Sequence, residues 1–240
     1  MVSAKSTATT MPADRGRDVK PPALIHNLNG QKLGRKGRDT RQRIIAATEE
    51  LLSEMPLEQI SLSAVARKVP LRMSSLYLYF ADLTELLLAV LEPVMAKAED
   101  AFLAQMRQRW PDDGLYDHCL AFLHAYHGFW DKNSPILHLR NQLADRKDLR
   151  MMHARVRAAQ PVIRLIVEQM DHGYEASGAP AYGMASVLYT GIERVVTIAT
   201  DKELQMALQS GVTPPVDRWL LSEARLLELG LRDYRATATR

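Results

Sequence analysis

Apolar residues recur at helical spacing from Thr40 almost to the end of this 240-residue chain. A period near 3.6 residues marks amphipathic helices, whereas half-buried strands alternate at every second residue. Beyond about residue 95 the helical pattern continues and no strand pattern is present. Hydrophobic residues make up 47% of the chain, which is enough for a sizeable core. We therefore predict an all-α protein.

Four helical segments are predicted before residue 98. They are expected at residues 40–55, 62–69, 73–80 and 83–97. Pro56 stops the first, and Asp82 followed by Glu85 has the spacing of a capping box at the start of the fourth. Two short helices joined by a turn and packed on a longer one are the layout of a helix-turn-helix. The same pattern also fits an αα-hairpin without a DNA role.

In a helix-turn-helix, the second short helix enters the major groove with its N-terminal residues at the base edges. Here that helix carries serine and tyrosine hydroxyls, which hydrogen-bond bases and phosphates. The DNA-contacting residues predicted in this region are Ser63, Arg72, Met73, Ser74, Ser75, Tyr77, Leu78 and Tyr79.

Positive charge is concentrated at the N-terminus. Residues 1–43 hold ten Lys and Arg against three Asp, whereas acidic residues outnumber basic ones in the remainder. Residues 1–34 are predicted to be a disordered basic arm, and the run Gly34-Arg-Lys-Gly-Arg38 is expected to be flexible and to attract phosphates. A solubilising tail fits the charge equally well. The residues assigned to DNA here are Arg35, Lys36, Arg38, Thr40, Arg41 and Arg43.

Residues 38–92 resemble the DNA-binding domain of the TetR family of bacterial transcriptional regulators. The resemblance lies in residues 40–47 of the first helix, 63–69 of the second and Leu76-Tyr77-Leu78-Tyr79-Phe80. It implies a dimer that binds a near-palindromic DNA operator. The chain departs from the family pattern at Pro70, where glycine is usual, and at Leu83, where lysine is common.

The same resemblance implies a helix-turn-helix domain at residues 35–82 and a helical ligand-sensing and dimerisation domain at 83–240. The apolar helices predicted at residues 181–200 and 217–229 are expected to form the dimer interface, although a core role within one protomer is the alternative. Gly230 is expected to end the last helix. The predicted interface residues are Val187, Leu188, Ile192, Val195, Trp219, Leu220, Leu226 and Leu227.

Aromatic, polar and methionine side chains of this second domain are the predicted pocket for a small, largely apolar effector. They are His124, His127, Trp130, Asn141, Met151, His153 and Tyr189. His124 and His127 share a helix face with Asp131, a set that can ligate zinc. Histidines at this spacing are common, so neither a metal nor any other cofactor is predicted.

No nucleotide-binding glycine pattern and no hydrolase or metalloprotease motif is present, so no enzymatic activity is predicted. The single cysteine, Cys119, excludes an intrachain disulfide, and the longest apolar runs are far shorter than the roughly 20 residues of a membrane span. We predict a cytoplasmic transcriptional repressor. The alternatives are an all-helical enzyme and a helical scaffold whose basic arm binds acidic partners.

Overall fold

A computed structural model describes residues 33–173, 179–207 and 216–238. Its α-helices are α1 (Arg35–Glu54), α2 (Leu62–Lys68), α3 (Met73–Leu76), α4 (Leu83–Ala96), α5 (Leu115–Lys132), α6 (Ser134–Asp145), α7 (Leu149–Gln169), α8 (Pro180–Thr200), α9 (Lys202–Ala207) and α10 (Val216–Ala238). Shorter helical segments are η1 (Leu57–Gln59), η2 (Glu99–Leu103) and η3 (Ala104–Met106). No strand occurs within these ranges, and the all-α prediction is confirmed.

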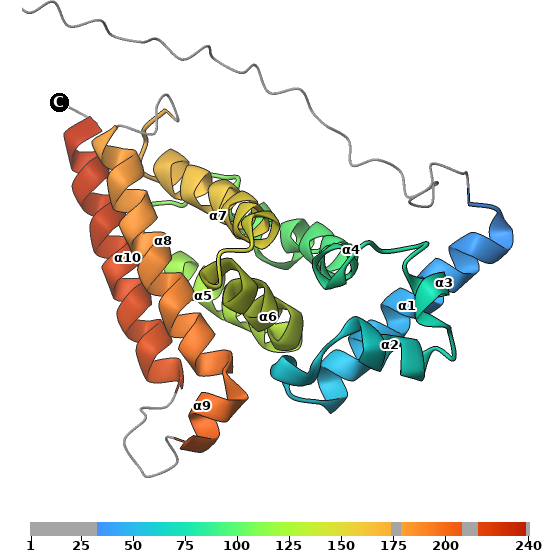
Figure 1. Ribbon diagram of the computed structural model, residues 1–240. Coiled ribbons are helices and arrows are strands. Elements are labelled where there is room, and N and C mark those ends of the chain that lie inside the picture. Colours follow the sequence, from blue (N-terminus) through green and yellow to red (C-terminus); the bar gives the residue numbers. More distant parts are fainter. Residues whose placement is uncertain (1–32, 174–178, 208–215, 239–240) are drawn as a thin grey trace, which may run out of the picture.

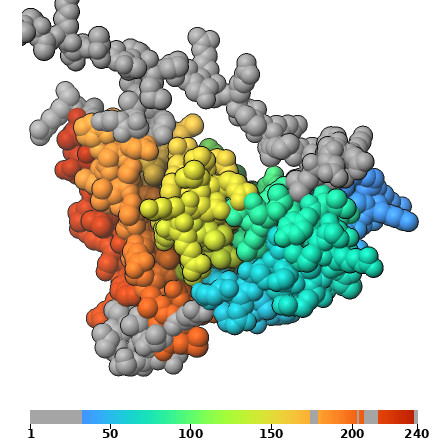
Figure 2. Space-filling view, viewed as in Figure 1, coloured from blue at the N-terminus to red at the C-terminus, as the bar shows by residue number. Residues whose placement is uncertain are grey.

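The helices follow one another across the molecule in chain order. Figure 1 shows α1, α2 and α3 at one end, α4 to α7 in the middle, and α8 beside α10 at the other end. α10 packs on α5 and α8, and α6 packs on α7. α4 contacts α1 on one side and α6 and α7 on the other, so it belongs to both halves of the fold. The space-filling view shows the two ends joined by a continuous body (Figure 2).

α1 begins at Arg35, five residues earlier than predicted, so the expectation of a flexible basic run is wrong here. Gly34 is the N-cap, and its carbonyl accepts a helical hydrogen bond. Leu33 is buried and its side chain packs over Gly37, where a Cβ would lie only 2.8 Å from it. Arginine and lysine favour helix, and adding residues to a formed helix is easier than nucleating one. The rest of the predicted arm lies outside the described residues.

The two short helices differ in how closely they follow the prediction. Ser61 caps α2 by accepting a hydrogen bond from the Ala64 N–H at 3.2 Å. α3 is a single turn that ends at Leu76, four residues before the predicted end. The chain then continues in tighter turns with three-residue hydrogen bonds, such as Tyr79 N–H to the Leu76 carbonyl. This tightening leaves both Leu76 and Phe80 fully buried.

Asp82 caps the start of α4 as predicted, but the return hydrogen bond to Glu85 comes from one residue before the N-cap. The Asp82 carboxylate accepts a hydrogen bond from the Glu85 N–H at 2.9 Å. The Glu85 carboxylate reaches back to the Ala81 N–H at 2.6 Å. One of the amide groups left free at a helix start, that of Glu85, is thereby satisfied, and the residue before the N-cap is bonded to the first turn of the helix.

α10 passes through Gly230 and extends to Ala238, so the prediction that this glycine ends the helix is wrong. Gly230 serves a packing role instead. A Cβ at this position would lie 2.8 Å from the Leu188 side chain of α8. The absence of a side chain therefore lets α8 and α10 approach closely.

An aromatic cluster forms the centre of the C-terminal body. Phe102 of η2 makes edge-to-face contacts with Phe122, Tyr126 and Phe129 of α5, with ring centroids 5.0 to 6.4 Å apart. Such contacts stabilise a core beyond the area they bury. Among the described helices, none is long and apolar enough to cross a membrane.

Candidate DNA-binding helices and a polar centre in the C-terminal body

α2 and α3 are held in a helix-turn-helix arrangement by a small core of their own. Val65 of α2, Leu76 of α3 and Phe80 have no exposed surface, and they belong to the same core as Ile44 of α1 and Leu86 of α4. The position of α3 is therefore fixed by apolar contacts on its inner face.

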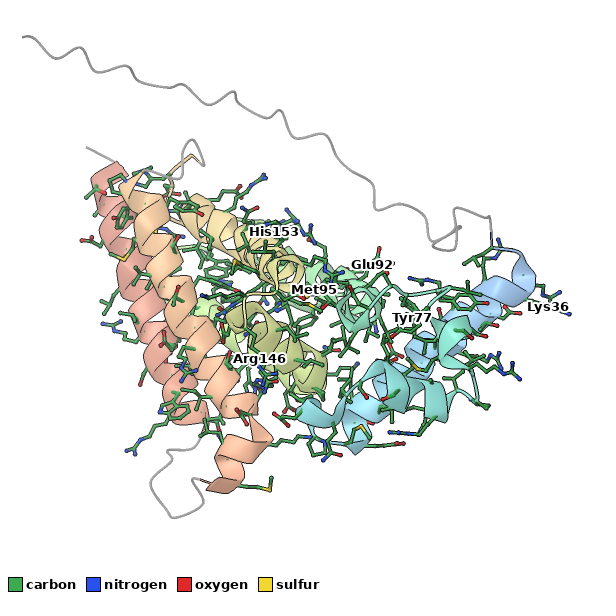
Figure 3. The ribbon with its side chains drawn as sticks, in the orientation of Figure 1. Lys36, Tyr77, Glu92, Met95, Arg146 and His153 are labelled. Carbon is green, nitrogen blue, oxygen red and sulfur yellow. The ribbon has the colours of Figure 1, made fainter. Side chains whose placement is uncertain are left out.

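The outer face of α3 is open to solvent. Tyr77 and Leu78 are large side chains, yet they expose 48% and 43% of their surface. Of the other residues predicted to contact DNA here, Ser63, Arg72 and Ser74 are exposed, while Met73, Ser75 and Tyr79 are half-buried. Figure 3 shows Tyr77 beside α3 and Lys36 at the outer end of α1, both remote from α8 and α10. Hydroxyl and cationic groups thus share the end of the molecule that carries α3.

The predicted contacts on α1 fall into two groups. Arg35, Lys36, Arg38 and Arg43 are exposed, and half-buried Thr40 donates to the Lys36 carbonyl at 2.9 Å. Arg41 differs, because its guanidinium stacks on the Phe80 ring at 4.7 Å from the centroid. Burial lowers the pKa of Arg41, against the opposing effect of nearby carboxylates. Its placement therefore favours a packing role rather than the free phosphate contact predicted.

Lys68, at the end of α2, has acidic partners within the protein. Its ammonium donates to both carboxylate oxygens of Glu54, at 2.8 and 2.9 Å, and lies 3.3 Å from Glu50. The hydrogen bonds to Glu54 raise the pKa of Lys68. Within residues 44–88 the other two cations are the exposed Arg67 and Arg72, so most of the positive charge at this end of the molecule lies on α1.

Four residues join the start of α4 to the start of α7, and we call them the α4–α7 clasp: Asp82, Thr84, Asp148 and Arg150. Asp148 caps α7, accepting from the Arg150 and Met151 N–H groups at 3.0 and 3.2 Å. Its other oxygen accepts from the Thr84 hydroxyl at 2.6 Å. In return, the Arg150 guanidinium donates to Asp82, the cap of α4, at 2.9 Å. Each helix start is thus bonded to the other.

The two carboxylates of the clasp are held in their ionised form. Burial alone would raise the pKa of Asp82, but hydrogen bonds from Arg150 and the Glu85 N–H outweigh it and lower that pKa. Burial likewise opposes the ionisation of Asp148, and the Thr84 hydroxyl with the Met151 N–H lowers its pKa in net terms. Both groups are therefore charged at neutral pH.

A set of polar side chains is buried where α5, α6 and α8 meet; we call it the buried polar centre, and it comprises Tyr126, Arg140, Asn141, Tyr189 and Glu193. Arg140 exposes 2% of its surface and donates twice to the Asn141 carbonyl oxygen, at 2.9 and 3.0 Å. The hydroxyls of Tyr126 and Tyr189 are 3.2 Å apart.

Burial perturbs the ionisation of this centre. It raises the pKa of Tyr126 to about 12 and raises that of Tyr189 as well, so both phenols are neutral at ordinary pH. It lowers the pKa of Arg140, whose guanidinium also lies 5.5 Å from the centroid of the Trp130 ring. The Arg140 Nη2 also lies 3.6 Å from the Glu193 carboxylate, so the buried cation has a buried counter-ion, and desolvating such a pair costs free energy.

A groove of about 340 Å³ opens beside this centre, between α6, α7 and α8. It is lined by Ala144, Asp145, Met152, Arg155, Val156, Ala159, Ile163, Ser186, Tyr189, Thr190 and Glu193. Tyr189 and Glu193 belong to both the groove and the buried polar centre. A ligand in the groove would therefore reach the polar network of the body.

The residues predicted for an effector pocket are only partly brought together. Tyr189 lines the groove, and Trp130 and Asn141 contact Arg140 directly. The other four are dispersed: Met151 is fully buried, His124 and His153 are exposed, and His127 is half-buried. Figure 3 shows His153 on α7. In the ranges that the structure describes, no three His, Cys, Asp or Glu side chains are placed to hold a metal ion.

Sequence reasoning missed Arg140 and Glu193. Arg140 lies on the buried face of α6 with Leu137 and Ala144, and Glu193 lies between Ile192 and Val196 on the buried face of α8. The signal available was a charged residue inside an otherwise apolar helical face, which marks either a buried ion pair or a ligand site.

The residues predicted for the dimer interface divide by exposure. Leu188, Ile192, Leu220 and Leu227 expose only 1% to 3% of their surface within a single protomer, so they pack in its α8–α10 core, the role that the sequence left open as the alternative. Sequence periodicity does not distinguish an apolar face buried within a protomer from one buried between protomers. Val187 and Leu226 expose 69% and 50%, and Val195 and Trp219 are half-buried.

No protein-family model matches the chain, and no curated protein matches it either. Solved structures do match. A TetR-like transcriptional regulator from Rhodococcus sp. RHA1 is 20% identical with a TM-score of 0.53, and the match covers 87% of this chain and 100% of the other. The fatty acid degradation regulator FadR from Bacillus halodurans is 17% identical with a TM-score of 0.55, covering 84% and 99%. A TetR/AcrR-family regulator from Thermobifida fusca is 18% identical with a TM-score of 0.51, covering 79% and 97%.

This chain has the fold of TetR-family regulators. The match extends over nearly the whole length of each of these structures, so it includes both the helix-turn-helix and the C-terminal body.

Proposed function

We propose that the protein is a transcriptional regulator that binds operator DNA through α3 and responds to a small molecule bound in its C-terminal body. The observation that carries the proposal is the exposed outer face of α3, with Arg72, Ser74 and Tyr77, on a helix-turn-helix whose inner face is fully packed. Exposed hydroxyl and cationic groups on such a helix suit base edges and phosphates.

The regulator would act as a dimer. Val187 and Leu226 are large apolar side chains left exposed on the adjacent helices α8 and α10, at the end opposite to α3 (Figure 1). A twofold axis through this face would pair the two copies and leave both α3 helices free. Half-sites of the operator would then lie about one DNA turn apart, or roughly 34–36 Å.

Ligand control would run through α4. This helix contacts α1 on the DNA-binding side and α6 and α7 on the other, and the α4–α7 clasp fixes its start. A ligand that favours a different position of α7 would move α4 and with it α3, shifting the population away from the DNA-binding geometry. The protein would then be a repressor released by its effector.

Capture of genomic DNA fragments on the purified full-length chain tests this function. The captured fragments are sequenced after washing at low salt and at near-physiological salt. Recovery at both salt concentrations of a near-palindrome with half-sites one turn apart is the expected result. Recovery without sequence preference, lost as salt rises, would contradict operator recognition and leave only phosphate attraction.

Tyr77→Phe tests how α3 meets DNA. The hydroxyl of this half-exposed residue is expected to contact phosphate, so its loss should weaken binding to specific and random duplexes by a similar factor of about three to ten. Fluorescence anisotropy with both duplexes measures the two affinities. A loss confined to one operator base pair would instead assign Tyr77 to base reading.

Leu226→Glu tests the dimer face. A charge in the centre of an apolar interface should weaken dimerisation by about thirtyfold or more and lower operator affinity with it. Sedimentation equilibrium and anisotropy measure the two effects. Leu221→Glu is the matched control, since Leu221 is also exposed, at 44%, but on another side of α10. Equal effects of both variants would place the interface elsewhere.

A further inference from the structure

The face formed by α8 and α10 contains a carboxylate that the protomer leaves without a partner. Glu223 is half-buried on α10, and its Oε2 is buried and accepts no hydrogen bond. Burial raises the pKa of Glu223, and no cation among the described residues opposes this effect. The other oxygen, Oε1, is not buried, so a donor that approaches this face can reach it. A half-buried carboxylate without a cation is unfavourable, so a cation supplied from outside the protomer would stabilise it.

Glu223 lies on the same face as the exposed apolar residues. Residues three or four positions apart share a helix face, so Glu223 is aligned with Leu226, one turn later on α10. Its Oε1 lies 3.4 Å from the position that a Cβ of Gly191 would occupy on α8. Gly191 in turn follows Val187 by one turn. The carboxylate therefore lies across the line where α8 and α10 meet, beside the turns that carry exposed Val187 and Leu226.

A cation lies on the same side of α8. Arg194 is exposed, and it continues the helix face of Val187 and Gly191 by about one further turn. No hydrogen bond or ion pair joins its side chain to any residue that the structure describes. Arg225, the next cation after Glu223 on α10, is instead bonded to Glu228. Arg194 is therefore the cation of this face that is available to a partner.

We infer that two copies of the chain pair through this face, with Glu223 of each protomer bonded to the partner's Arg194. In a twofold interface every contact is repeated in the opposite direction, so one such combination of residues gives two ion pairs. Val187 and Leu226 would supply the apolar area, and the two ion pairs would fix the register of one copy on the other. The inference rests on the proposed function, because it names the contacts that specify the dimer of the regulator.

Glu223→Arg and Arg194→Glu test the two sides of the contact separately. Either variant places like charges opposite each other at both repeats of the contact, so each should weaken dimerisation by about thirtyfold or more. Sedimentation equilibrium measures the dissociation constant of each dimer, and circular dichroism checks that the helices are intact. A dissociation constant equal to that of the wild type in either variant would contradict the inference.

A mixture of the two variants distinguishes a contact between protomers from one within a protomer. In a mixed dimer the new arginine of one copy meets the new glutamate of the other, and the second contact keeps the native pair. The mixed dimer should therefore form in preference to both homodimers, with a dissociation constant within about threefold of the wild type. Native mass spectrometry separates the three dimers, because the two protomers differ in mass. Random mixing, as expected for a pair formed within each protomer, would overturn the inference.

Arg218→Glu is the matched control for the mixture. Arg218 is also exposed on α10, but it lies five positions before Glu223 and so on another side of the helix. Mixed with Glu223→Arg, it supplies the same change in net charge without the proposed contact. The mixed dimer should then be weaker than the Arg218→Glu homodimer. A preference equal to that of the first mixture would mean that overall charge selects the partner, and the inference would fail.

The wild-type protein and Leu226→Glu separate failure of this inference from failure of the proposed regulator. A wild type that stays monomeric while it binds its operator would overturn both the proposed dimer and the ion pairs. A wild-type dimer that Leu226→Glu disrupts and that neither charge variant weakens would remove only the contact between Glu223 and Arg194. Operator affinity, measured by fluorescence anisotropy, should fall in each charge variant and return to the wild-type value in their mixture, because two half-sites require a dimer.

Discussion

Gln169→Leu is expected to lower the free energy of unfolding by about 3–5 kcal/mol. Gln169 exposes 1% of its surface at the end of α7 and bonds four partners. Its amide nitrogen donates to the Met106 and Gln108 carbonyls at 2.9 and 2.8 Å. Its oxygen accepts from the Trp110 N–H at 2.9 Å and from Arg235 at 3.2 Å. Leucine fills a similar volume but leaves these buried groups without their partner.

Urea unfolding followed by circular dichroism measures this loss, with an unchanged dependence on denaturant concentration. Gln160→Leu is the matched control, since Gln160 is exposed on the same helix and its replacement should cost less than about 0.5 kcal/mol. A cost for Gln169→Leu close to that of the control would mean that water replaces the amide and that the segment before α5 does not depend on it.

The helical architecture was predictable because its determinants are local. The Asp82 cap of α4 depends on residues three positions apart, and the structure contains its hydrogen bond from the Glu85 N–H as predicted. The start of α1 and the end of α10 were predicted wrongly for one reason. The sequence suggests flexibility at Gly37 and a helix end at Gly230, whereas the folded chain uses the missing side chain at each to admit Leu33 and Leu188.

The functional regions were predictable to different degrees. The residues around α3 could be proposed as DNA contacts from the sequence because a helix-turn-helix places its contacts at fixed positions in the chain. The buried polar centre could not, because Arg140 and Glu193 are separated by 53 positions and meet only when α6 packs beside α8. The clasp similarly joins Thr84 to Asp148, 64 residues apart. Contacts of this range depend on the register of helix packing, which periodicity does not specify.

Periodicity also does not show which apolar residues of α8 and α10 are buried within the protomer and which stay exposed. Val187 and Leu188 are neighbours in sequence, yet one exposes 69% of its surface and the other 3%. Hydrophobicity alone assigns both to one interface. The packing of α10 against α8 is what buries Leu188 within the protomer and leaves Val187 available to a partner.

The α4–α7 clasp should behave as one energetic unit. Thr84→Val keeps the shape of a side chain that is 7% exposed and removes the hydroxyl that donates to Asp148. We expect a loss of about 1–2 kcal/mol, because the bond is to a charged acceptor in a partly buried place. Asp148→Asn should cost a similar amount, and the double variant little more than either. The coupling energy from this cycle should therefore be about 1 kcal/mol or more.

Urea unfolding of the four proteins gives the cycle, and hydrogen exchange locates the effect. Loss of one hydroxyl on α4 should speed exchange in the first turns of both α4 and α7, since each start is bonded to the other. Thr197→Val is the control, because the Thr197 hydroxyl donates within α8 only, to the Glu193 carbonyl. Additive costs with faster exchange confined to α4 would show that the two helix starts are independent, and α4 would then need another contact with α7 to transmit a change in the body to α3.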